Sequence, residues 1–301
     1  MAHAHSPLRY PGGKQILARV LAHLIHLNGA RGGIYAEPYA GGAGASLALL
    51  FGEHVDRILI NDADPSIYAF WHGILHDTDR FLRLLRDTPV TLEEWARQRQ
   101  TYQHPKRHSA LRVGFATFFL NRCNRSGIIP NGGPIGGQHQ SGIWKLDVRF
   151  TRAELIRRIS RIALYRDRIS ISNLDAIKFL KRHVESRDDL RGMFVYLDPP
   201  YYAQGQKLYL NYYKPPDHAS LAAYLVKAKF LWVMSYDNVP EITTLYVRLR
   251  QVPFDLSYCA RERRIGKEIM ILKRGLEFPT EWLGGIPAQY ISAADRIDAS
   301  A

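Results

Sequence analysis

The order strand, tight turn, helix occurs twice in succession near the start of the chain, and it constrains the fold more than any other feature. The first unit has a strand pattern at residues 34–37, a glycine-rich turn and an apolar helix pattern at 45–51. In the second unit, a strand pattern at 57–61 ends at Asp62, and Pro65 stands where a helix can begin. Two such units predict a parallel sheet covered by helices.

The same alternation returns in the second half of the chain. Strand and helix patterns follow one another at residues 168–172, 175–183, 193–197, 218–229 and 230–235. Two last strand patterns, at 247–254 and 268–272, are suited to close the sheet as an antiparallel pair. We therefore expect an α/β fold with a mixed sheet of seven strands flanked by helices.

Between these two parts, from residue 77 to 150, helical patterns replace the strands. Thr91 and Glu94 have the spacing of a capping box, and residues 110–120 are apolar and aromatic. A stretch at 124–145 is rich in Gly, Asn, Gln and Pro, and loops of that length usually serve a function. The pattern predicts a helical insertion that carries a long loop.

The insertion divides one discontinuous domain, formed by residues 1–76 and 151–275. Thr151 and Glu154 again have the spacing of a capping box, at the start of the helix that resumes the domain. Residues 276–301 are polar and small, and we expect a loose tail there.

The chain is strongly basic, with 41 Lys and Arg against 28 Asp and Glu and a formal charge of +13, and seven arginines fall between Arg149 and Arg168. This balance favours a polyanion such as nucleic acid as partner, although a basic protein without such a partner can have the same composition. No run of about 18 uncharged apolar residues and no apolar signal sequence is present, so we expect a cytoplasmic protein with no membrane partner. The two cysteines lack CxxC spacing and the histidines lack paired ligand spacing, so we expect no metal site.

Asp198-Pro199-Pro200-Tyr201 directly follows the apolar strand pattern at 193–197. Two consecutive prolines continue neither a strand ladder nor a helix, so the chain leaves the sheet in a stiff loop. That loop lies at the carboxyl edge of the sheet, where open α/β folds bind ligands. The acid Asp198 and the aromatic ring of Tyr201 are thus held at fixed positions over the edge of the sheet where ligands bind. The alternative interpretation is that the tetrapeptide is simply a turn that ends the strand.

These features together resemble one family. The tetrapeptide resembles the catalytic motif of amino-methyltransferases, and the chain from about residue 6 to 273 is similar to the Dam-type (D12 class) adenine-specific DNA N6-methyltransferases. The other matching motifs are Arg9-Tyr10-Pro11-Gly12-Gly13-Lys14, Glu37-Pro38-Tyr39-Ala40-Gly41-Gly42-Ala43-Gly44, Asn61-Asp62-Ala63-Asp64, Asn121-Arg122, and the run from Leu208-Tyr209 through His218 to Ser235-Tyr236-Asp237-Asn238. The resemblance implies a Rossmann-like methyltransferase fold in which the helical insertion serves target recognition.

The resemblance also implies S-adenosylmethionine as cofactor. Glycines in the turn let the backbone approach it, and Glu37 at a strand tip suits its ammonium group. Asp62 is placed for the ribose hydroxyls, with a helix N-terminal acid as the alternative. By analogy Asp175 approaches the cofactor adenine, although helix capping explains this residue nearly as well. The predicted cofactor-binding residues are Tyr10, Gly13, Lys14, Glu37, Pro38, Gly41, Gly42, Asp62, Asp175 and Asp198.

The implied acceptor is the exocyclic N6 amine of adenine, a poor nucleophile because its lone pair is delocalised into the ring. The carboxylate of Asp198 and the backbone carbonyl of Pro199 can accept the two amine hydrogens and so localise the lone pair. Tyr201 can stack on the base, which must be flipped from the duplex because its amine is otherwise paired. The predicted catalytic residues are Asp198, Pro199, Pro200 and Tyr201, and no covalent enzyme intermediate is needed.

The resemblance places DNA recognition in the insertion and its loop. Asn121 and Arg122 match the family there, and Arg125 and Ser126 follow at the loop entrance, so these four are the predicted DNA-binding residues. Arginine can bind guanine bidentately, whereas the arginines from Arg149 to Arg168 suit phosphates; a solvated surface arginine is the alternative for each. The loop has no pattern that defines the target sequence.

We therefore expect a site-specific DNA adenine N6-methyltransferase that acts as a monomer on double-stranded DNA, with a cognate restriction endonuclease as a further candidate partner. The same chemistry on adenine in RNA, or on the N4 amine of cytosine, is the nearest alternative. A DNA-binding protein that has lost catalysis is a second alternative, but it predicts damage to the catalytic loop, and that loop is intact.

Overall fold

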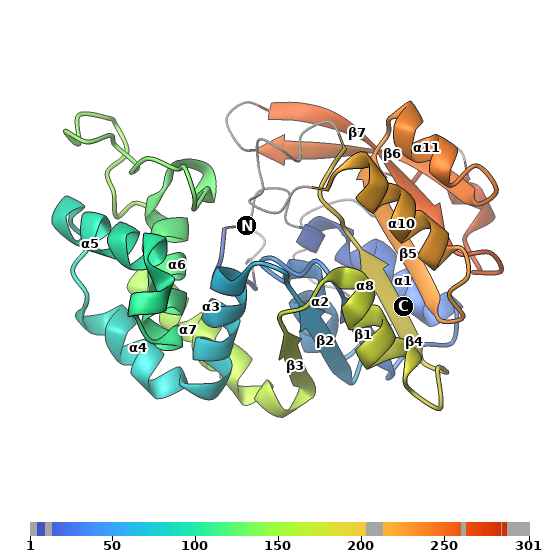
Figure 1. The fold of residues 1–301 in the computed structure, drawn as a ribbon, viewed down its shortest axis with the longest axis horizontal. Coiled ribbons are helices and arrows are strands. Elements are labelled where there is room, and N and C mark those ends of the chain that lie inside the picture. The colour runs from blue at the N-terminus through green and yellow to red at the C-terminus, as the bar shows by residue number, and fades with distance from the viewer. Residues whose placement is uncertain (1–4, 10–13, 203–212, 260–262, 284, 288–301) are drawn as a thin grey trace.

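The computed structural model of the chain describes residues 5–9, 14–202, 213–259, 263–283 and 285–287. In these residues seven strands form one sheet, in the order β3-β2-β1-β4-β5-β7-β6 (Figure 1). The strands are Ile34–Glu37 (β1), Arg57–Asn61 (β2), Ile169–Ser172 (β3), Met193–Leu197 (β4), Leu231–Asp237 (β5), Arg250–Cys259 (β6) and Arg263–Leu272 (β7). Strands β1 to β5 are parallel, and β7 pairs antiparallel with both β5 and β6. The predicted α/β fold with a mixed sheet of seven strands is confirmed.

Some helices flank the sheet, and others form a separate group at one end of it. They are α1 (Ala18–Leu27), α2 (Gly44–Phe51), α3 (Pro65–His76), α4 (Thr78–Asp87), α5 (Leu92–Gln103), α6 (Ala110–Cys123), α7 (Arg152–Leu164), α8 (Ala176–Phe179), α10 (Pro215–Leu225) and α11 (Pro240–Leu245). A π-helical segment, η5 (Leu180–Glu185), continues α8, and short 3-10 turns occur at η1 (Lys14–Leu17), η2 (Pro105–Arg107), η3 (Arg125–Gly127), η4 (Arg166–Arg168) and η6 (Thr280–Trp282). None of the helices described is long and apolar enough to cross a membrane.

The central strand β4 shows why the sequence folds in this way. All five of its residues are buried, because parallel neighbours β1 and β5 pair with its two edges and apolar side chains pack on both faces. Along β1, Tyr35 belongs to the apolar cluster on one face and Ala36 to the cluster on the other. The sheet therefore has two hydrophobic layers, and its strand ends are the places left for polar chemistry.

The helices of the insertion, α4, α5 and α6, lie together beside α3 and α7 (Figure 1). Their buried side chains, among them Trp95 and Phe118, join the same apolar cluster as Tyr35 in the sheet. Gly114 brings α6 against α3, since a Cβ at this position would lie 2.3 Å from the carbonyl oxygen of Ala69. The insertion thus shares a core with the sheet, which fixes its position relative to the strand ends.

This close approach makes Gly114→Ala a test of the shared core. Alanine gains about 1 kcal/mol of helix propensity, but the Cβ clash with the Ala69 carbonyl forces α6 and α3 apart. We expect a net loss of about 2 kcal/mol in unfolding free energy, measured from urea denaturation midpoints. Gly133→Ala is the control, because a Cβ there has no atom within 4 Å. Equal midpoints for the two variants would show that α6 and α3 do not pack this closely.

Helix starts follow the sequence in one case and depart from it in another. Thr91 caps α5, with its hydroxyl accepting from the Glu94 amide at 3.1 Å, which is one half of the predicted capping box. The Glu94 carboxylate accepts instead from Arg97 and Gln98, at 2.9 and 2.6 Å. The capping box predicted at Thr151 is wrong, because the Thr151 side chain makes no cap hydrogen bond. The Glu154 carboxylate accepts instead from Arg157 and from Arg158, at 2.9 and 2.7 Å. Two guanidinium groups thus occupy the carboxylate that a capping box requires.

The prediction of a loose tail after residue 275 is wrong for its first part. Leu276, Phe278, Trp282 and Ile286 are buried, and the Trp282 ring lies 5.0 Å from that of His23 on α1. These large apolar residues are spaced among polar ones, and each packs into the core because burial removes its surface from water. Residues 288–301 lie outside the described part of the chain.

Candidate functional site

Three predicted acids meet at the carboxyl edge of the sheet. Glu37 ends β1, Asp62 follows β2, and Asp198 follows β4, and these three strands are neighbours in the sheet. The strand order reverses between β1 and β4, and open α/β sheets bind ligands at that crevice. The fold therefore brings the predicted cofactor acids and the predicted catalytic acid to one place.

Asp198 is held by polar groups from two directions. Its Oδ1 atom accepts a hydrogen bond from the Ser235 hydroxyl at 3.1 Å and lies 3.4 Å from the Lys14 ammonium. Ser235 is itself fixed by the Tyr196 hydroxyl at 2.7 Å. Burial raises the pKa of Asp198, while Lys14 and Ser235 act in the opposite direction. Both of these contacts are made to Oδ1, so among the described residues Oδ2 is left to meet a ligand.

Lys14 lies buried between Asp198 and a second carboxylate, that of Glu268 on β7. Its Nζ atom is 3.2 Å from Glu268 Oε2, and it also hydrogen-bonds the hydroxyl of Tyr201. The Tyr201 hydroxyl in turn donates to Glu268 Oε1. Sequence reasoning missed Glu268, although an acid at the head of the apolar run at residues 269–272 was a signal that could have found it. Glu268 thus links Lys14 of the amino-terminal motif to Tyr201 of the loop after β4, and it belongs to neither of these segments.

The loop after β4 is braced from β5 and α10. The backbone amide of Tyr202 donates to Asp237 Oδ1 at 3.1 Å. The Tyr202 ring lies 5.2 Å from the ring of His218, whose Nδ1 is 2.6 Å from the Tyr236 hydroxyl. Pro199 is buried and Pro200 half-buried in this loop. Asp237, His218 and Tyr236 all belong to the run from Leu208 to Asn238 that matches the family, so that run supports the loop as well as forming a strand.

Glu37 is almost fully buried, at 3% exposure, and its carboxylate accepts a hydrogen bond from the Ser46 hydroxyl on α2. Burial raises its pKa to about 8, helped by the charge of Asp198 and opposed by Ser46. The described residues provide no cation within ion-pair distance of this carboxylate. A buried acid in this position is suited to receive a cationic group from a ligand.

Asp62 organises the glycine-rich turn after β1. Its two carboxylate oxygens accept the backbone amides of Gly41 and Asp64, each at 2.9 Å. Burial raises its pKa to about 7. Asp64, not Asp62, caps helix α3, accepting from the Ser66 amide at 2.8 Å. Asp62 therefore does not cap α3, and its carboxylate holds the glycine-rich turn.

The turn itself requires glycine at one position. Gly41 has a φ of 47°, in the left-handed region that glycine adopts without strain, and its carbonyl accepts from the Trp71 indole at 2.9 Å. The carbonyl of Pro38 accepts from the Asn61 amide at 3.0 Å, and Gly42 is buried beside them. The predicted residues of this turn thus form one hydrogen-bonded unit at the strand edge.

Three other predicted cofactor residues are not placed in that unit. Asp175 is exposed and caps α8, accepting from the amides of Ile177 and Lys178 at 3.0 and 3.1 Å. Capping thus accounts for it, and its approach to a cofactor stays a prediction. Tyr10 and Gly13 lie outside the described residues.

Comparison with known proteins assigns the family. A family model described as D12 class N6 adenine-specific DNA methyltransferase matches residues 10–257. The chain belongs to this family. It is therefore an enzyme of the DNA adenine N6-methyltransferases, and the resemblance given by its motifs is confirmed. A search of curated proteins finds no match.

A solved structure described as a conserved hypothetical protein from Streptococcus pyogenes matches this methyltransferase at 11% sequence identity, covering 82% of this chain and 90% of its own. The TM-score of 0.31 is too low to support an argument from that structure.

The structure places two predicted DNA-binding residues of the methyltransferase inside the protein. Asn121 has no exposed surface, and its amide group accepts from the Arg9 amide at 2.7 Å and donates to the Arg9 and Gly127 carbonyls at 2.9 Å. Arg122, 8% exposed, donates to the carbonyls of Arg149 and Pro7. Neither side chain can contact DNA in this conformation. Their role here is to bind Pro7 and Arg9, at the start of the amino-terminal motif, to the insertion.

Arg125 and Ser126 do lie at the surface end of α6, where the loop begins. Arg125 is exposed, and Ser126 is half-buried with a left-handed φ of 56°. The loop beyond them is cross-braced by Gln140, whose side chain bonds the Ile135 and Gly137 carbonyls and the Leu146 amide. Next to this brace, Ile143 is 92% and Trp144 65% exposed. The loop thus presents two large apolar side chains to solvent.

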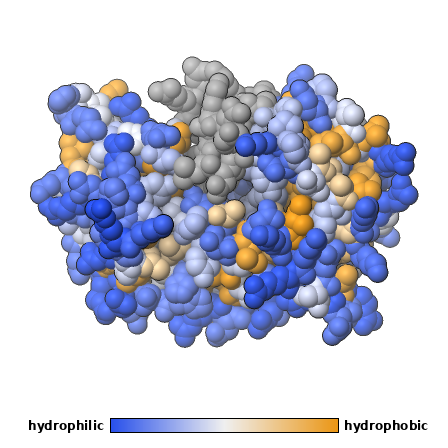
Figure 2. Space-filling view, in the orientation of Figure 1, coloured by the Kyte–Doolittle hydropathy of each residue, from blue (hydrophilic) through white to orange (hydrophobic). Residues whose placement is uncertain are grey.

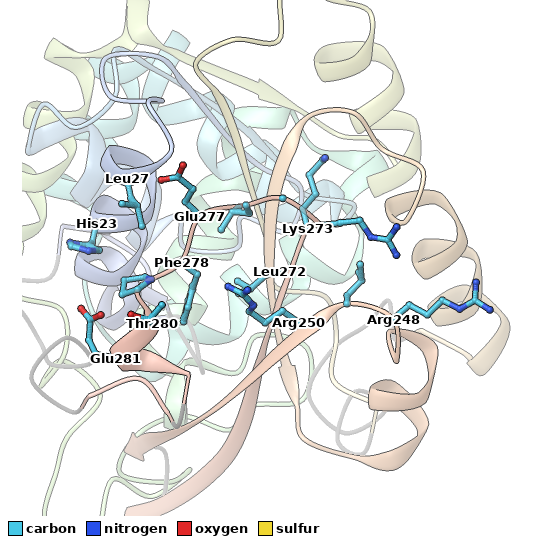
Figure 3. A pocket seen from close by; sticks show the side chains of 15 residues that line it. His23, Leu27, Arg248, Arg250, Leu272, Lys273, Glu277, Phe278, Thr280 and Glu281 are labelled. Atoms are coloured by element: carbon cyan, nitrogen blue, oxygen red, sulfur yellow. The ribbon is translucent and has the colours of Figure 1, made fainter.

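A large cavity lies away from this site. It has a volume of about 710 Å³, with Arg248, Arg250 and Lys273 on one side and His23 and Phe278 on the other (Figure 3). Leu272, which also lines it, pairs with Val233 near the start of β5, so the cavity is at the sheet edge opposite Asp198. None of the predicted site residues of the methyltransferase lines this cavity.

Proposed function

We propose that this enzyme transfers the methyl group of S-adenosylmethionine to the N6 amine of an adenine flipped out of double-stranded DNA. The observation that carries the proposal is the position of Asp198 at the strand-order reversal, beside the acids that suit the donor. When bound there, S-adenosylmethionine supplies an electrophilic methyl group on a sulfonium. The protein's own residues then bind, orient and activate the amine.

The residues at the end of β1 and β2 fit such a donor. Glu37 is a buried acid with no cation among the described residues at ion-pair distance, and it would bind the methionine ammonium. Asp62 would accept hydrogen bonds from the ribose hydroxyls through the lone pairs that Gly41 and Asp64 do not use. The left-handed Gly41 leaves the backbone open to close approach.

The loop after β4 has hydrogen-bond acceptors suited to the N6 amine of adenine. Asp198 would accept one amine hydrogen through Oδ2, and the carbonyl of Pro199 would accept the other, which localises the nitrogen lone pair. The ring of Tyr201 would stack on the flipped base while its hydroxyl stays anchored to Glu268. With both amine hydrogens held, the nitrogen lone pair would face the methyl group that the bound donor supplies, and no covalent intermediate with the protein would be needed.

DNA binding would use the insertion loop and the arginines that are not already paired. Arg157 and Arg158 are engaged by Glu154, and Arg168 by Glu53. Arg149, Arg161 and Arg166 are exposed and form no ion pair with the described residues, so they are the candidates for phosphate contacts. Figure 2 shows a mostly hydrophilic face over α4 and its neighbours, with few apolar side chains. Action as a monomer in the cytoplasm, and a cognate restriction endonuclease as partner, belong to the same proposal.

A competition assay with labelled S-adenosylmethionine tests the acceptor. Duplex DNA, RNA of the same sequence and duplexes already methylated on adenine are offered at equal concentration. We expect label only in unmethylated duplex DNA. Label in RNA, or undiminished label in the adenine-methylated duplex, would overturn the proposed acceptor.

The exposed tryptophan of the loop gives a prediction for DNA affinity. Aromatic stacking on a base is worth about 1–3 kcal/mol, so Trp144→Ala should weaken DNA binding roughly tenfold or more, measured by fluorescence anisotropy. The affinity for the cofactor should not change. Val247→Ala is the control, since Val247 is 74% exposed beside the distant cavity. If both variants bound DNA like the natural protein, the loop tip would not be part of the interface.

A further inference from the structure

Glu268 is a buried charge that the fold does not require. It is 1% exposed at the head of an otherwise apolar stretch of β7, and it pairs across the sheet with Asp237. Burying a carboxylate costs several kcal/mol unless it is paired, and an apolar residue here would continue the run at 269–272. Its ion pair and its hydrogen bond go to Lys14 and Tyr201 of the active site.

These contacts give Lys14 two carboxylates to neutralise. Its Nζ is 3.4 Å from Asp198 Oδ1 and 3.2 Å from Glu268 Oε2, and Lys14 is itself only 4% exposed. The group formed by Lys14, Asp198 and Glu268, with all three ionised, therefore has one net negative charge. A lone lysine–aspartate pair would have none. Because of the second carboxylate, the group can bind one proton and become neutral.

The titration of the two acids follows this charge balance. Burial raises the pKa of Glu268 above its ordinary value, and the negative charge of Asp198 raises it further. Repulsion between two like charges acts on both partners, so Glu268 must also favour a proton on Asp198. The other groups that face Glu268 are Tyr201 from the loop after β4 and Asp237 from β5.

We propose that Glu268 is a positioning residue that competes with Asp198 for Lys14, so that Asp198 can take up the proton that the amine releases on methylation. The proposal rests on the proposed function. The nitrogen lone pair forms the new bond to the methyl carbon, and the electrons of the broken carbon–sulfur bond leave with sulfur. The amine is then cationic. One of its N–H bonds breaks, the electron pair returns to nitrogen, and the proton passes to the Asp198 carboxylate, which brings the group of three to zero net charge.

Two measurements on Glu268→Gln test this role. The first is the titration of Asp198 in the cofactor-free protein, followed by the carboxyl ¹³C shift. Without the second negative charge, Lys14 pairs with Asp198 alone, so we expect the apparent pKa of Asp198 to fall by about one unit or more. The second is the pH profile of kcat, where the rate should fall about tenfold and the acid limb should move to lower pH, with KM for DNA unchanged.

Two variants serve as controls. Glu268→Asp keeps the charge and should retain the acid limb near its natural position, and it keeps the test valid if glutamine at 268 does not fold. Glu277→Gln removes an exposed acid at the opposite sheet edge and should change neither measurement. An Asp198 titration and an acid limb that stay in place in Glu268→Gln would overturn the proposal. If the natural enzyme methylated another amine, the proposed acceptor would fail, yet the shift in the Asp198 titration would still be seen, so the two failures are distinguishable.

Discussion

Replacing Asp198 with alanine is expected to lower the single-turnover rate of methyl transfer about a thousandfold or more. The change removes the acceptor that localises the amine lone pair, and it leaves Lys14 and Ser235 without their shared partner. Rapid-quench assays with labelled donor on duplex DNA measure this rate directly. Affinities for cofactor and DNA should stay within a few-fold of the natural values, because Glu37, Asp62 and the insertion loop are unchanged.

Ser235→Ala is a milder variant with which the rate of Asp198→Ala can be compared. It removes a single hydrogen bond to Oδ1 at 3.1 Å, so the rate should fall about tenfold while the carboxylate remains. A variant without Asp198 that still turned over at a comparable rate would refute the role given to this carboxylate. Loss of cofactor binding in the same variant would instead assign Asp198 to the donor pocket.

The second large effect is expected at Glu37. Its replacement by glutamine removes the buried negative charge that would pair with the donor ammonium, which should weaken cofactor binding by about 1.5–3 kcal/mol, or roughly tenfold to a hundredfold. Isothermal titration calorimetry measures the change. Glu53→Gln is the control, since that glutamate pairs with Arg168 on the surface. Unchanged affinity in Glu37→Gln would remove this residue from the donor site.

The same carboxyl predicts a proton linkage. Burial raises the pKa of Glu37 to about 8, so in the cofactor-free protein at pH 7 the group is largely protonated. Binding of a cation stabilises the ionised form, so a proton must leave, and affinity should increase with pH from 6 toward 8. Calorimetry at pH 7 in buffers of different ionisation enthalpy should show proton release for the natural protein and much less for Glu37→Gln. Equal release from both would contradict the linkage.

The sequence predicted the strands that position the site because their patterns are local. Strands β2 and β4 begin and end at the residues that their patterns predicted, 57–61 and 193–197. Parallel strands covered on both faces are largely apolar, and in β2 only the two end residues, Arg57 and Asn61, are polar. The order of the strands then places Glu37, Asp62 and Asp198 at one edge. The strand limits and the loop after β4 needed only periodicity, the two prolines and the rule for ligand binding at strand ends, whereas the cofactor roles of Glu37 and Asp62 followed from the family resemblance.

What the sequence did not predict depends on packing between distant segments. Glu268 meets Lys14 across 254 positions of sequence, and no local pattern reports such a contact. Asn121 stands among apolar residues of α6, and its match to the family suggested DNA contact, whereas tertiary packing turns its amide inward to the backbone of Arg9. Trp282 was assigned to a tail by the composition around it, although a single large ring is enough to attach that segment to the core.

The most direct test of the account is the identity of the methylated base. Duplex DNA is incubated with the enzyme and with S-adenosylmethionine that carries a deuterated methyl group, then digested to nucleosides and analysed by mass spectrometry. The labelled methyl is expected to appear as N6-methyldeoxyadenosine, and it should disappear when Asp198→Ala replaces the natural protein. Label in N4-methyldeoxycytidine, or in no base at all with the natural protein, would contradict this expectation.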